Sequence, residues 1–388
     1  MSTYARKDIA FTKGEGVWLW DQNGEKYLDA LSGIAVCGLG HAHPKVAEAI
    51  SEQAQTLLHT SNIYRISAQE KLGDRLCSIA NMDRAFFCNS GAEANEAAIK
   101  LARLHGRSKQ IDVPTIIVCE NSFHGRTMAT LTATGNRKAH AGFEPLVAGF
   151  VRAPFNDADT IAQICSSNSN IAAIFVEPIQ GEGGINVPEN NYLNQLRDIC
   201  DQHNLLLMLD EIQTGNGRTG EWFAYQKNAI LPDVVTTAKG LGNGVPIGAC
   251  LAKGQAAELF GPGTHGSTFG GNPLACATAL RVLEIIEKDK LLDNAKSIGS
   301  EIMKGLQTSL DSSPIVHDIR GHGLMIGIEL TTPCAEMVDI ALSKNLLLNV
   351  TANNVIRILP PLLTNSKEAE IIVNTIRDCI YEFQSTLD

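Results

Sequence analysis

The chain has 388 residues, a formal charge of −10, and a composition of 44% hydrophobic and 19% charged residues. These values are typical of a folded globular protein of two or three domains, and they argue against a largely disordered chain. The acidic balance, without any Lys/Arg-rich block, argues against binding to nucleic acid or to an anionic membrane. No apolar run reaches the roughly 18 residues that span a bilayer, so we expect a cytoplasmic protein.

The opening segment contains an Asn23-Gly24 turn that predicts a hairpin, and two histidines follow it in "GHAHP". His41 and His43 could bind a metal, but no other Cys/His cluster lies near them. We therefore expect no metal site and interpret both as loop or structural histidines. The ten cysteines form no C-x-x-C pair, which indicates reduced thiols rather than a disulfide framework.

The middle of the chain alternates short apolar runs with stretches of helical period. Helices are predicted over 90–106 and 189–203. The apolar runs that predict buried strands are "TIIVCE" (115–120), "IAAIFVEP" (171–178), "LLLMLDE" (205–211), "DVVTTAK" (233–239) and "PIGACLA" (246–252). This alternation predicts an α/β fold, with a mainly parallel sheet and helices on both faces.

The last hundred residues have a different pattern, with a long helical stretch, two short strand-like runs and a final helix over 366–383. This pattern predicts a smaller α+β domain. We predict three parts: an N-terminal segment, 1–55, that packs with the small domain; a large domain, 56–290; and the small domain, 291–388.

The stretch "NSGAEANEAAIKLAR" predicts a helix with a well-defined start. Ser90 and Glu93 form an S-x-x-E capping box, and Gly91 and Ala92 place no bulk before the first N–H groups. Such a helix N-terminus can bind a phosphate or a carboxylate through backbone donors and the helix dipole. A plain capped helix is the alternative.

Two charged residues each follow an apolar run at the expected carboxyl edge of the sheet, where ligands of open α/β sheets bind. They are Asp210 and Lys239, and glycines occupy positions 240, 242 and 244. Burial would favour the neutral amine of Lys239, and a buried carboxylate needs a cationic partner. The pair predicts either a structural salt bridge or a pyridine cofactor attached to Lys239, with Asp210 at the ring nitrogen.

A glycine-rich motif, "GNGRTG" (215–220), fits G-x-G-x-x-G, and Asp233 follows near the spacing of a dinucleotide-binding fingerprint. However, "DEIQT" separates the preceding strand from the glycines, and the next segment is a poor crossover helix that ends in Pro232. We therefore do not expect NAD binding.

Six motifs occur in order between roughly residues 15 and 365. They are "NSGAEANEAAIKLAR", "FHGRT", "EPIQGEGG", "DEIQTGNGRTG", "TTAKGLGNGVPIGA" and "GSTFGGNPLACA". Together they resemble the signatures of the class III pyridoxal-phosphate-dependent aminotransferases, most closely the acetylornithine aminotransferases. The resemblance implies a fold-type-I transferase that is a homodimer with a shared active site.

The resemblance also implies pyridoxal 5'-phosphate (PLP) as the cofactor, with Lys239 as the catalytic residue that attaches it. The implied cofactor contacts are Gly91 and Ala92 to the phosphate, Phe123 stacked on the ring, Asp210 at the ring nitrogen, Gln213 at the ring hydroxyl, and Thr268 to the phosphate from the neighbouring subunit. Without the resemblance, Phe123 would be interpreted as a core residue.

Substrate recognition is also implied by the resemblance, and arginine suits it because its planar fork matches a carboxylate. Arg126 corresponds to the residue that binds the α-carboxylate, and Arg357 to a second arginine with Glu182 as its switchable partner. Ser267 is expected beside the substrate. Without the resemblance, these residues would be interpreted as structural or loop residues.

Two positions depart from the family pattern. Position 216 is Asn where members usually have an apolar residue, and position 34 is Ile where ornithine aminotransferases tend to have Tyr. An apolar wall at Ile34 suits an acylated amine better than the charged amine of free ornithine.

We therefore predict transfer of the δ-amino group between N-acetylornithine and 2-oxoglutarate in arginine biosynthesis. The alternatives within the family are succinylornithine, succinyl-diaminopimelate and ornithine as substrates, or an aminomutase or decarboxylase. A cofactor-free binding protein of the same fold is the alternative from another class.

Overall fold

The computed structural model describes residues 1–387 and is organised around a seven-stranded sheet. The sheet order is β4-β10-β9-β8-β7-β5-β6, and the five strands from β9 to β6 run parallel. Its strands are β4 (Arg84–Cys88), β5 (Thr115–Cys119), β6 (Phe150–Ala153), β7 (Ile171–Val176), β8 (Leu206–Asp210), β9 (Val234–Thr237) and β10 (Gly248–Ala252). The prediction of a mainly parallel sheet is confirmed.

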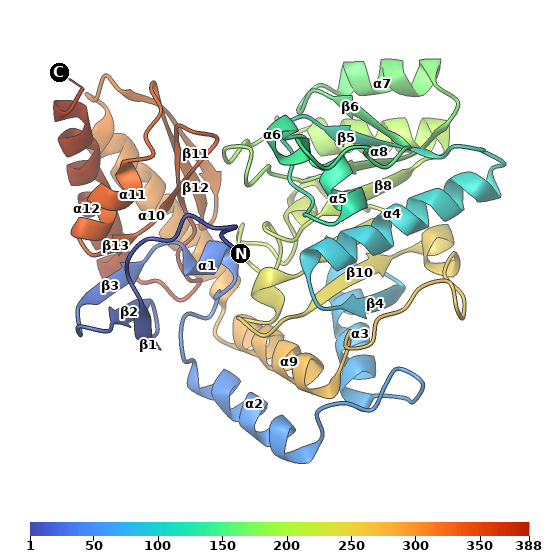
Figure 1. The fold of residues 1–388 in the computed structure, drawn as a ribbon, viewed down its shortest axis with the longest axis horizontal. Helices are drawn as coiled ribbons and strands as arrows, with labels where there is room; N and C mark the ends of the chain where they lie inside the picture. Colours follow the sequence, from blue (N-terminus) through green and yellow to red (C-terminus); the bar gives the residue numbers. More distant parts are fainter. Residues whose placement is uncertain (388) are drawn as a thin grey trace.

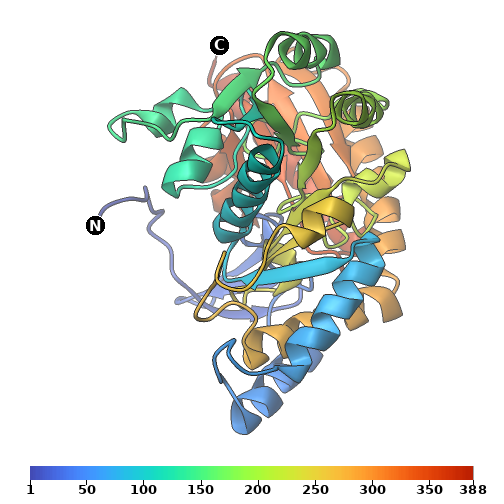
Figure 2. The ribbon, with the colours of Figure 1, turned by 90° about the vertical axis from the view of Figure 1, so that its right-hand side faces the viewer.

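Helices cover both faces of this sheet (Figure 1 and Figure 2) because successive strand residues point to opposite sides. On β5, Ile116 packs on the side of α4, whereas Ile117 packs on the side of α3, α7, α8 and α9. The longer helices are α3 (Ser67–Ala80), α4 (Gly91–Ser108), α7 (Ala158–Ser167), α8 (Tyr192–His203) and α9 (Pro273–Lys288). The shorter ones are α5 (Met128–Ala133), α6 (Arg137–His140), and the 3-10 helices η1 (Ala224–Asn228), η2 (Lys239–Leu241) and η3 (Gly254–Glu258).

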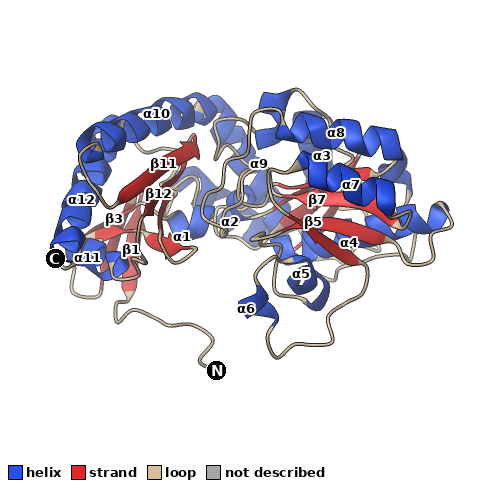
Figure 3. Cartoon of the chain, turned by 90° about the horizontal axis from the view of Figure 1, so that it is seen from above, coloured by secondary structure: helices blue, strands red, loops and turns tan. Residues whose placement is uncertain are grey.

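The C-terminal part has its own antiparallel sheet, in the order β11-β12-β15-β14. Its strands are β11 (Val316–His322), β12 (Met325–Leu330), β14 (Asn349–Thr351) and β15 (Val355–Ile358). Its helices are α10 (Leu291–Leu310), α11 (Met337–Ser343) and α12 (Ser366–Ser385), which lie to one side of β11 and β12 in Figure 3. The predicted final helix is confirmed.

The N-terminal strands β1 (Phe11–Glu15), β2 (Trp18–Asp21) and β3 (Lys26–Asp29) form the expected hairpin. Strand β3 pairs in parallel with β13 (Leu346–Leu347), which joins this segment to the C-terminal part. Two helices follow, α1 (Ser32–Ala35) and α2 (Pro44–Thr56), and α2 lies beside α9 of the central region (Figure 1). The N-terminal segment thus touches both parts, and the predicted boundaries near residues 55 and 290 stay predictions.

Two predicted strand runs differ from the observed strands in detail. The run over 233–239 ends at Thr237, because the backbone turns into η2 at Lys239. The run over 246–252 is β10, which pairs antiparallel with both β4 and β9. The link between β9 and β10 is too short for a helical crossover, and only a crossover would allow parallel pairing.

The structure also shows the surroundings of His41 and whether any helix could span a membrane. His41 lies against Asp29, with Nε2 2.7 Å from Oδ2, and this bond raises the pKa of His41 to about 9. Within residues 1–387, no helix combines the length and the apolar composition needed to cross a membrane.

Candidate active site

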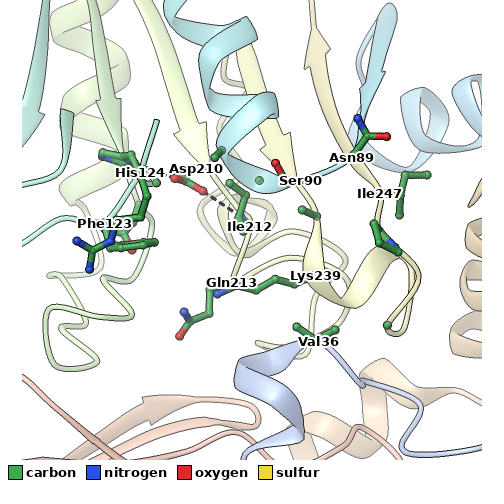
Figure 4. A pocket seen from close by; sticks show the side chains of 18 of the residues that line it. Val36, Asn89, Ser90, Phe123, His124, Asp210, Ile212, Gln213, Lys239 and Ile247 are labelled. Atoms are coloured by element: carbon green, nitrogen blue, oxygen red, sulfur yellow. Dashed lines mark hydrogen bonds and ion pairs between the residues drawn. The ribbon is translucent and has the colours of Figure 1, made fainter. Parts of the chain in front are cut away.

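A cavity of about 400 Å³ lies at the carboxyl edge of the parallel strands (Figure 4). Ligands of open α/β sheets bind at this edge, and the volume lies within the range of small-molecule sites. Seven residues predicted from the sequence line it together: Gly91, Ala92, Phe123, Arg126, Asp210, Gln213 and Lys239.

Helix α4 points its N-terminus at the cavity. Ser90 Oγ accepts a hydrogen bond from the N–H of Glu93 at 3.2 Å, as the capping box predicts. The Glu93 carboxylate instead accepts from the N–H of Asn89, one residue before the cap. The first N–H groups of a helix have no intrahelical acceptor, so those of Gly91 and Ala92 can bind an anion. A Cβ on Gly91 would lie 2.7 Å from Ile212, which explains the glycine.

Asp210 is buried at the end of β8, and three donors surround its carboxylate. Oδ2 accepts from His124 Nδ1 at 2.8 Å and from Asn95 Nδ2 at 2.7 Å, and Oδ1 accepts from the N–H of Ile212 at 3.1 Å. No ion pair joins Asp210 to Lys239 in the described chain, so the structural salt bridge weighed above is absent. The donors instead fix the orientation of a carboxylate that faces the cavity.

His124 and Asn95 were not predicted as site residues. The His124 ring stacks on Phe175 with centroids 4.4 Å apart, and its Nε2 has no hydrogen-bond partner among residues 1–387. Asn95 also accepts from Thr236 Oγ1 at 2.7 Å. Two features of the sequence could have indicated them: His124 is adjacent to Phe123, and Asn95 is a polar residue on the alanine-rich face of the predicted helix.

Lys239 follows β9 directly, with a left-handed backbone (φ 45°) that non-glycine residues seldom adopt. Loss of contact with water lowers the pKa of Lys239 to about 8. The nearby Glu182 opposes this shift and Arg357 adds to it, but desolvation dominates. At a pKa of about 8, roughly a tenth of the amine is neutral and nucleophilic at pH 7, far more than for an ordinary lysine.

Arg357 and Glu182 form an ion pair, with Nη1 2.6 Å from Oε1. The Arg357 side chain is fully buried and also donates to Gln213 Oε1 at 3.3 Å and to Asn349 Oδ1 at 3.1 Å, while 35% of the Glu182 side chain is exposed. Burial alone would raise the pKa of Glu182, but Arg357 lowers it. The guanidinium is thus held by several acceptors, and the carboxylate is the partner exposed to solvent.

Arg126 and Phe123 come from one loop, and Glu177 anchors that loop. The Arg126 guanidinium carbon lies 5.4 Å from the centroid of the Phe123 ring, and Arg126 is exposed. Buried Glu177 accepts from the N–H of Phe123 at 3.0 Å and from the N–H of Gly181 at 3.2 Å, and burial raises its pKa to about 7. Arg126 also lines a neighbouring cavity of about 670 Å³ that includes Glu182.

Ser267 and Thr268 are not brought to this cavity. They line a separate one of about 530 Å³ with Glu93 and Lys100, and Asn89 borders both cavities. Ser267 Oγ accepts from the N–H of Gly270 at 2.9 Å and from Asn89 Nδ2 at 3.3 Å. Their predicted contacts with cofactor and substrate would need a second subunit and stay predictions.

The groups around the main cavity fit a phosphorylated pyridine. An amine of lowered pKa, a fixed carboxylate, an aromatic ring and a helix N-terminus surround one space, and the donor set matches the aldehyde, ring nitrogen, ring face and phosphate of PLP. Within the described residues no His, Cys, Asp and Glu side chains cluster as metal ligands would.

Comparisons with known proteins point the same way. The family model described as Aminotransferase class-III matches residues 2–380. The acetylornithine aminotransferase of Nitrosomonas europaea is 58% identical, over 99% of this chain and 98% of that protein. The crystal structure of acetylornithine aminotransferase from Elizabethkingia anophelis is 36% identical, with a TM-score of 0.90, and covers 98% of this chain and 96% of that chain. An ornithine aminotransferase structure from Toxoplasma gondii, with partial occupancy of PLP at its active site, is 34% identical, with a TM-score of 0.96, and covers 100% and 93%.

Proposed function

This chain belongs to the class III aminotransferases, and we propose that it transfers the δ-amino group of N-acetylornithine to 2-oxoglutarate, forming N-acetylglutamate semialdehyde and glutamate. The observation that carries the proposal is that Lys239 and Asp210 line one cavity whose Gln213 accepts a hydrogen bond from Arg357, an arginine of β15 that is paired with Glu182. The 58% identity to an acetylornithine aminotransferase along nearly the whole chain supports the substrate.

The ornithine aminotransferase has the higher TM-score, but a TM-score compares backbones and carries no information on the substrate. The sequence identity favours the acetylated substrate, at 58% against 34%. The wall near the cavity is also apolar, because Val36 lines it and Ile34, two residues earlier, packs against an apolar cluster that includes Ala35 and Ile185. Such a wall suits an acylated amine better than a second charged one.

PLP, when bound, supplies an electron sink that stabilises negative charge on the reacting carbon. The N–H groups of Gly91 and Ala92 would hold its phosphate, Asp210 its ring nitrogen, Gln213 its ring hydroxyl and Phe123 its ring face. Lys239 would attach the cofactor and then, as a free amine, take a proton from the substrate carbon and return it.

Substrate selection rests on the two arginines. Arg126, exposed at the junction of two cavities, would bind the α-carboxylate. Glu182 would mask Arg357 while N-acetylornithine reacts and move away when 2-oxoglutarate brings a second carboxylate. A site for two carboxylated substrates in turn favours transamination over decarboxylation or aminomutase chemistry.

The proposal includes the biological setting. We place the enzyme in arginine biosynthesis and in the cytoplasm. It would be a homodimer in which Ser267 and Thr268 complete the neighbouring site, and their separation from Lys239 within one chain supports this.

The decisive experiment follows the visible absorption of the purified holoenzyme as N-acetylornithine is added without any oxo acid. We expect a cofactor band that depends on Lys239, bleaches with this donor and returns with 2-oxoglutarate. Parallel titrations with ornithine and succinylornithine rank the substrates. A band that N-acetylornithine leaves unchanged would contradict the substrate, and a colourless protein that takes up no PLP would contradict the chemistry.

A further inference from the structure

The glycine-rich loop 215–220 contacts the backbone segment that leads into Lys239. Its Asn216 is 4% exposed, and its Nδ2 donates to Thr237 Oγ1 at 2.9 Å and to the carbonyl of Ala238 at 3.1 Å. Because a carbonyl can only accept, the Ala238 contact identifies the amide nitrogen. The side chain therefore binds the two residues that immediately precede Lys239.

The backbone at this point is strained. Lys239 has φ 45°, and left-handed non-glycine residues persist only where their surroundings hold them. The Ala238 carbonyl also accepts from the N–H of Leu241 at 3.0 Å, which closes η2. A Cβ on Gly240 would touch Asn216 Cβ at 3.4 Å, so Asn216 packs against both sides of Lys239.

Asn216 is not an optimal choice for packing. Its Oδ1 is buried and has no hydrogen-bond partner within residues 1–387, and an unpaired buried acceptor is destabilising. A buried polar side chain with an unpaired atom does not favour stability, so its presence points to another role. The residue itself has φ 56°, which asparagine tolerates better than most residues.

We propose that Asn216 is a positioning residue that holds the Ala238–Lys239 backbone and thereby keeps the Lys239 amine in the cavity. This inference rests on the proposed role of Lys239. It assigns a role to loop 215–220, none of whose residues lines the cavity. Without the amide, Lys239 gains freedom to reach water, and the pKa of its amine rises from about 8 towards an ordinary value.

Two variants remove the amide in different ways. Asn216→Leu keeps the branched shape of the side chain but strains a left-handed position, whereas Asn216→Gly relieves that strain. The matched control is Asn204→Leu, because Asn204 has φ 53° at the exposed end of α8 and lies outside the cavity. The control reproduces the backbone strain without touching Lys239.

The primary measurement is the pH profile of Lys239 labelling by trinitrobenzenesulfonate in the full-length, cofactor-free chain, located by peptide mass spectrometry. We expect both Asn216 variants to raise the midpoint by about half a unit or more, and Asn204→Leu to match wild type. In the holoenzyme, kcat should fall about tenfold with KM nearly unchanged, because a misplaced reacting group slows the chemical step.

Coinciding profiles for wild type and both Asn216 variants would overturn the inference and leave Asn216 a packing residue. A lower thermal midpoint with an unchanged labelling profile would overturn it in the same way. If Asn216→Leu fails to fold, Asn216→Gly decides. The labelling needs neither PLP nor substrate, so failure of the proposed function, seen as a wild-type protein that binds no PLP, is recorded separately.

Discussion

Replacing Glu182 by Ala should change the preference between amino donors. Arg357 lowers the pKa of Glu182, so the carboxylate is ionised at neutral pH and its loss removes a full negative charge. The Arg357 guanidinium is fully buried, with Nη1 2.6 Å from Glu182 Oε1. In the variant it is free to bind another carboxylate. Glutamate brings a second carboxylate and gains this partner, whereas N-acetylornithine does not.

The size of the change in donor preference follows from the hydrogen bond that Arg357 would gain to the second carboxylate of glutamate. A hydrogen bond to a charged group contributes about 1.5–3 kcal/mol, so the ratio of kcat/KM for glutamate to that for N-acetylornithine should rise roughly 10- to 140-fold. The lower half of this range is the better expectation, because Glu182 is 35% exposed and water can partly replace its carboxylate.

The assay is the half-reaction with each donor alone, followed by cofactor absorbance in a stopped-flow instrument. The control is Asp233→Asn, which breaks another partly buried ion pair, Arg197 Nη1 to Asp233 Oδ2 at 2.8 Å, outside the cavity lining. It should change both donors equally. Equal losses for both donors in Glu182→Ala would refute the masking role and leave the pair as a structural contact.

Three other substitutions test the fold and the substrate site. Burial raises the pKa of Glu211 from 4.5 to about 7, so the folded state holds its proton more tightly and wild-type stability should fall as pH rises between these values. Glu211→Gln should reduce this slope in thermal midpoints, with buried Glu177 contributing the remainder, and curves parallel to wild type would contradict the prediction. Arg218→Met should lower the unfolding free energy by roughly 2–6 kcal/mol in urea, because the carbonyls of Leu324 and Pro360 lose their donor, and a midpoint like wild type would exclude this anchor. Arg126→Ala should raise KM for N-acetylornithine roughly 10- to 140-fold with little change in kcat, and an unchanged KM would place the α-carboxylate elsewhere.

The sequence predicts the middle of the central sheet well because those strands are buried on both faces and therefore consist of continuous apolar runs. It does not identify β4 and β6, the two edge strands in the sheet order. Both begin partly exposed, and each includes an arginine, Arg84 or Arg152. The antiparallel direction of β10 was also not predicted, because it depends on the length of a connection rather than on the strand residues.

The candidate site was partly predictable for the same reason. Asp210 and Lys239 each follow an apolar run at the carboxyl edge, so the topology alone brings them to one cavity. The partner of Asp210 was not predictable. It is His124, 86 residues away in the sequence, together with Asn95, 115 residues away. The sequence distance between two neighbouring strands predicts which strand ends meet. It does not predict that a loop residue, His124, and a helix residue, Asn95, donate to Asp210.

The glycine-rich loop shows what a local pattern leaves out. Its spacing fits a phosphate-binding fingerprint, yet its side chains contact other parts of the same chain. Arg218 is buried and donates to the carbonyls of Leu324 and Pro360 and, at 3.4 Å, to Ser32 Oγ. Burial lowers its pKa to about 10, and no carboxylate pairs with it in the described chain.

The loop therefore couples the two ends of the chain to the lysine. Arg218 donates to the carbonyl of Pro360, two residues after β15, the strand that carries Arg357, while Asn216 binds the residue before Lys239. One short segment thus contacts the neighbourhoods of both the group that would bind a substrate carboxylate and the group that would move the proton. A glycine opposite this loop lets the two backbones pass closely: a Cβ on Gly323, between β11 and β12, would lie 2.6 Å from the backbone of Thr219. Placement in three dimensions, rather than the motif itself, therefore determines what this loop contacts.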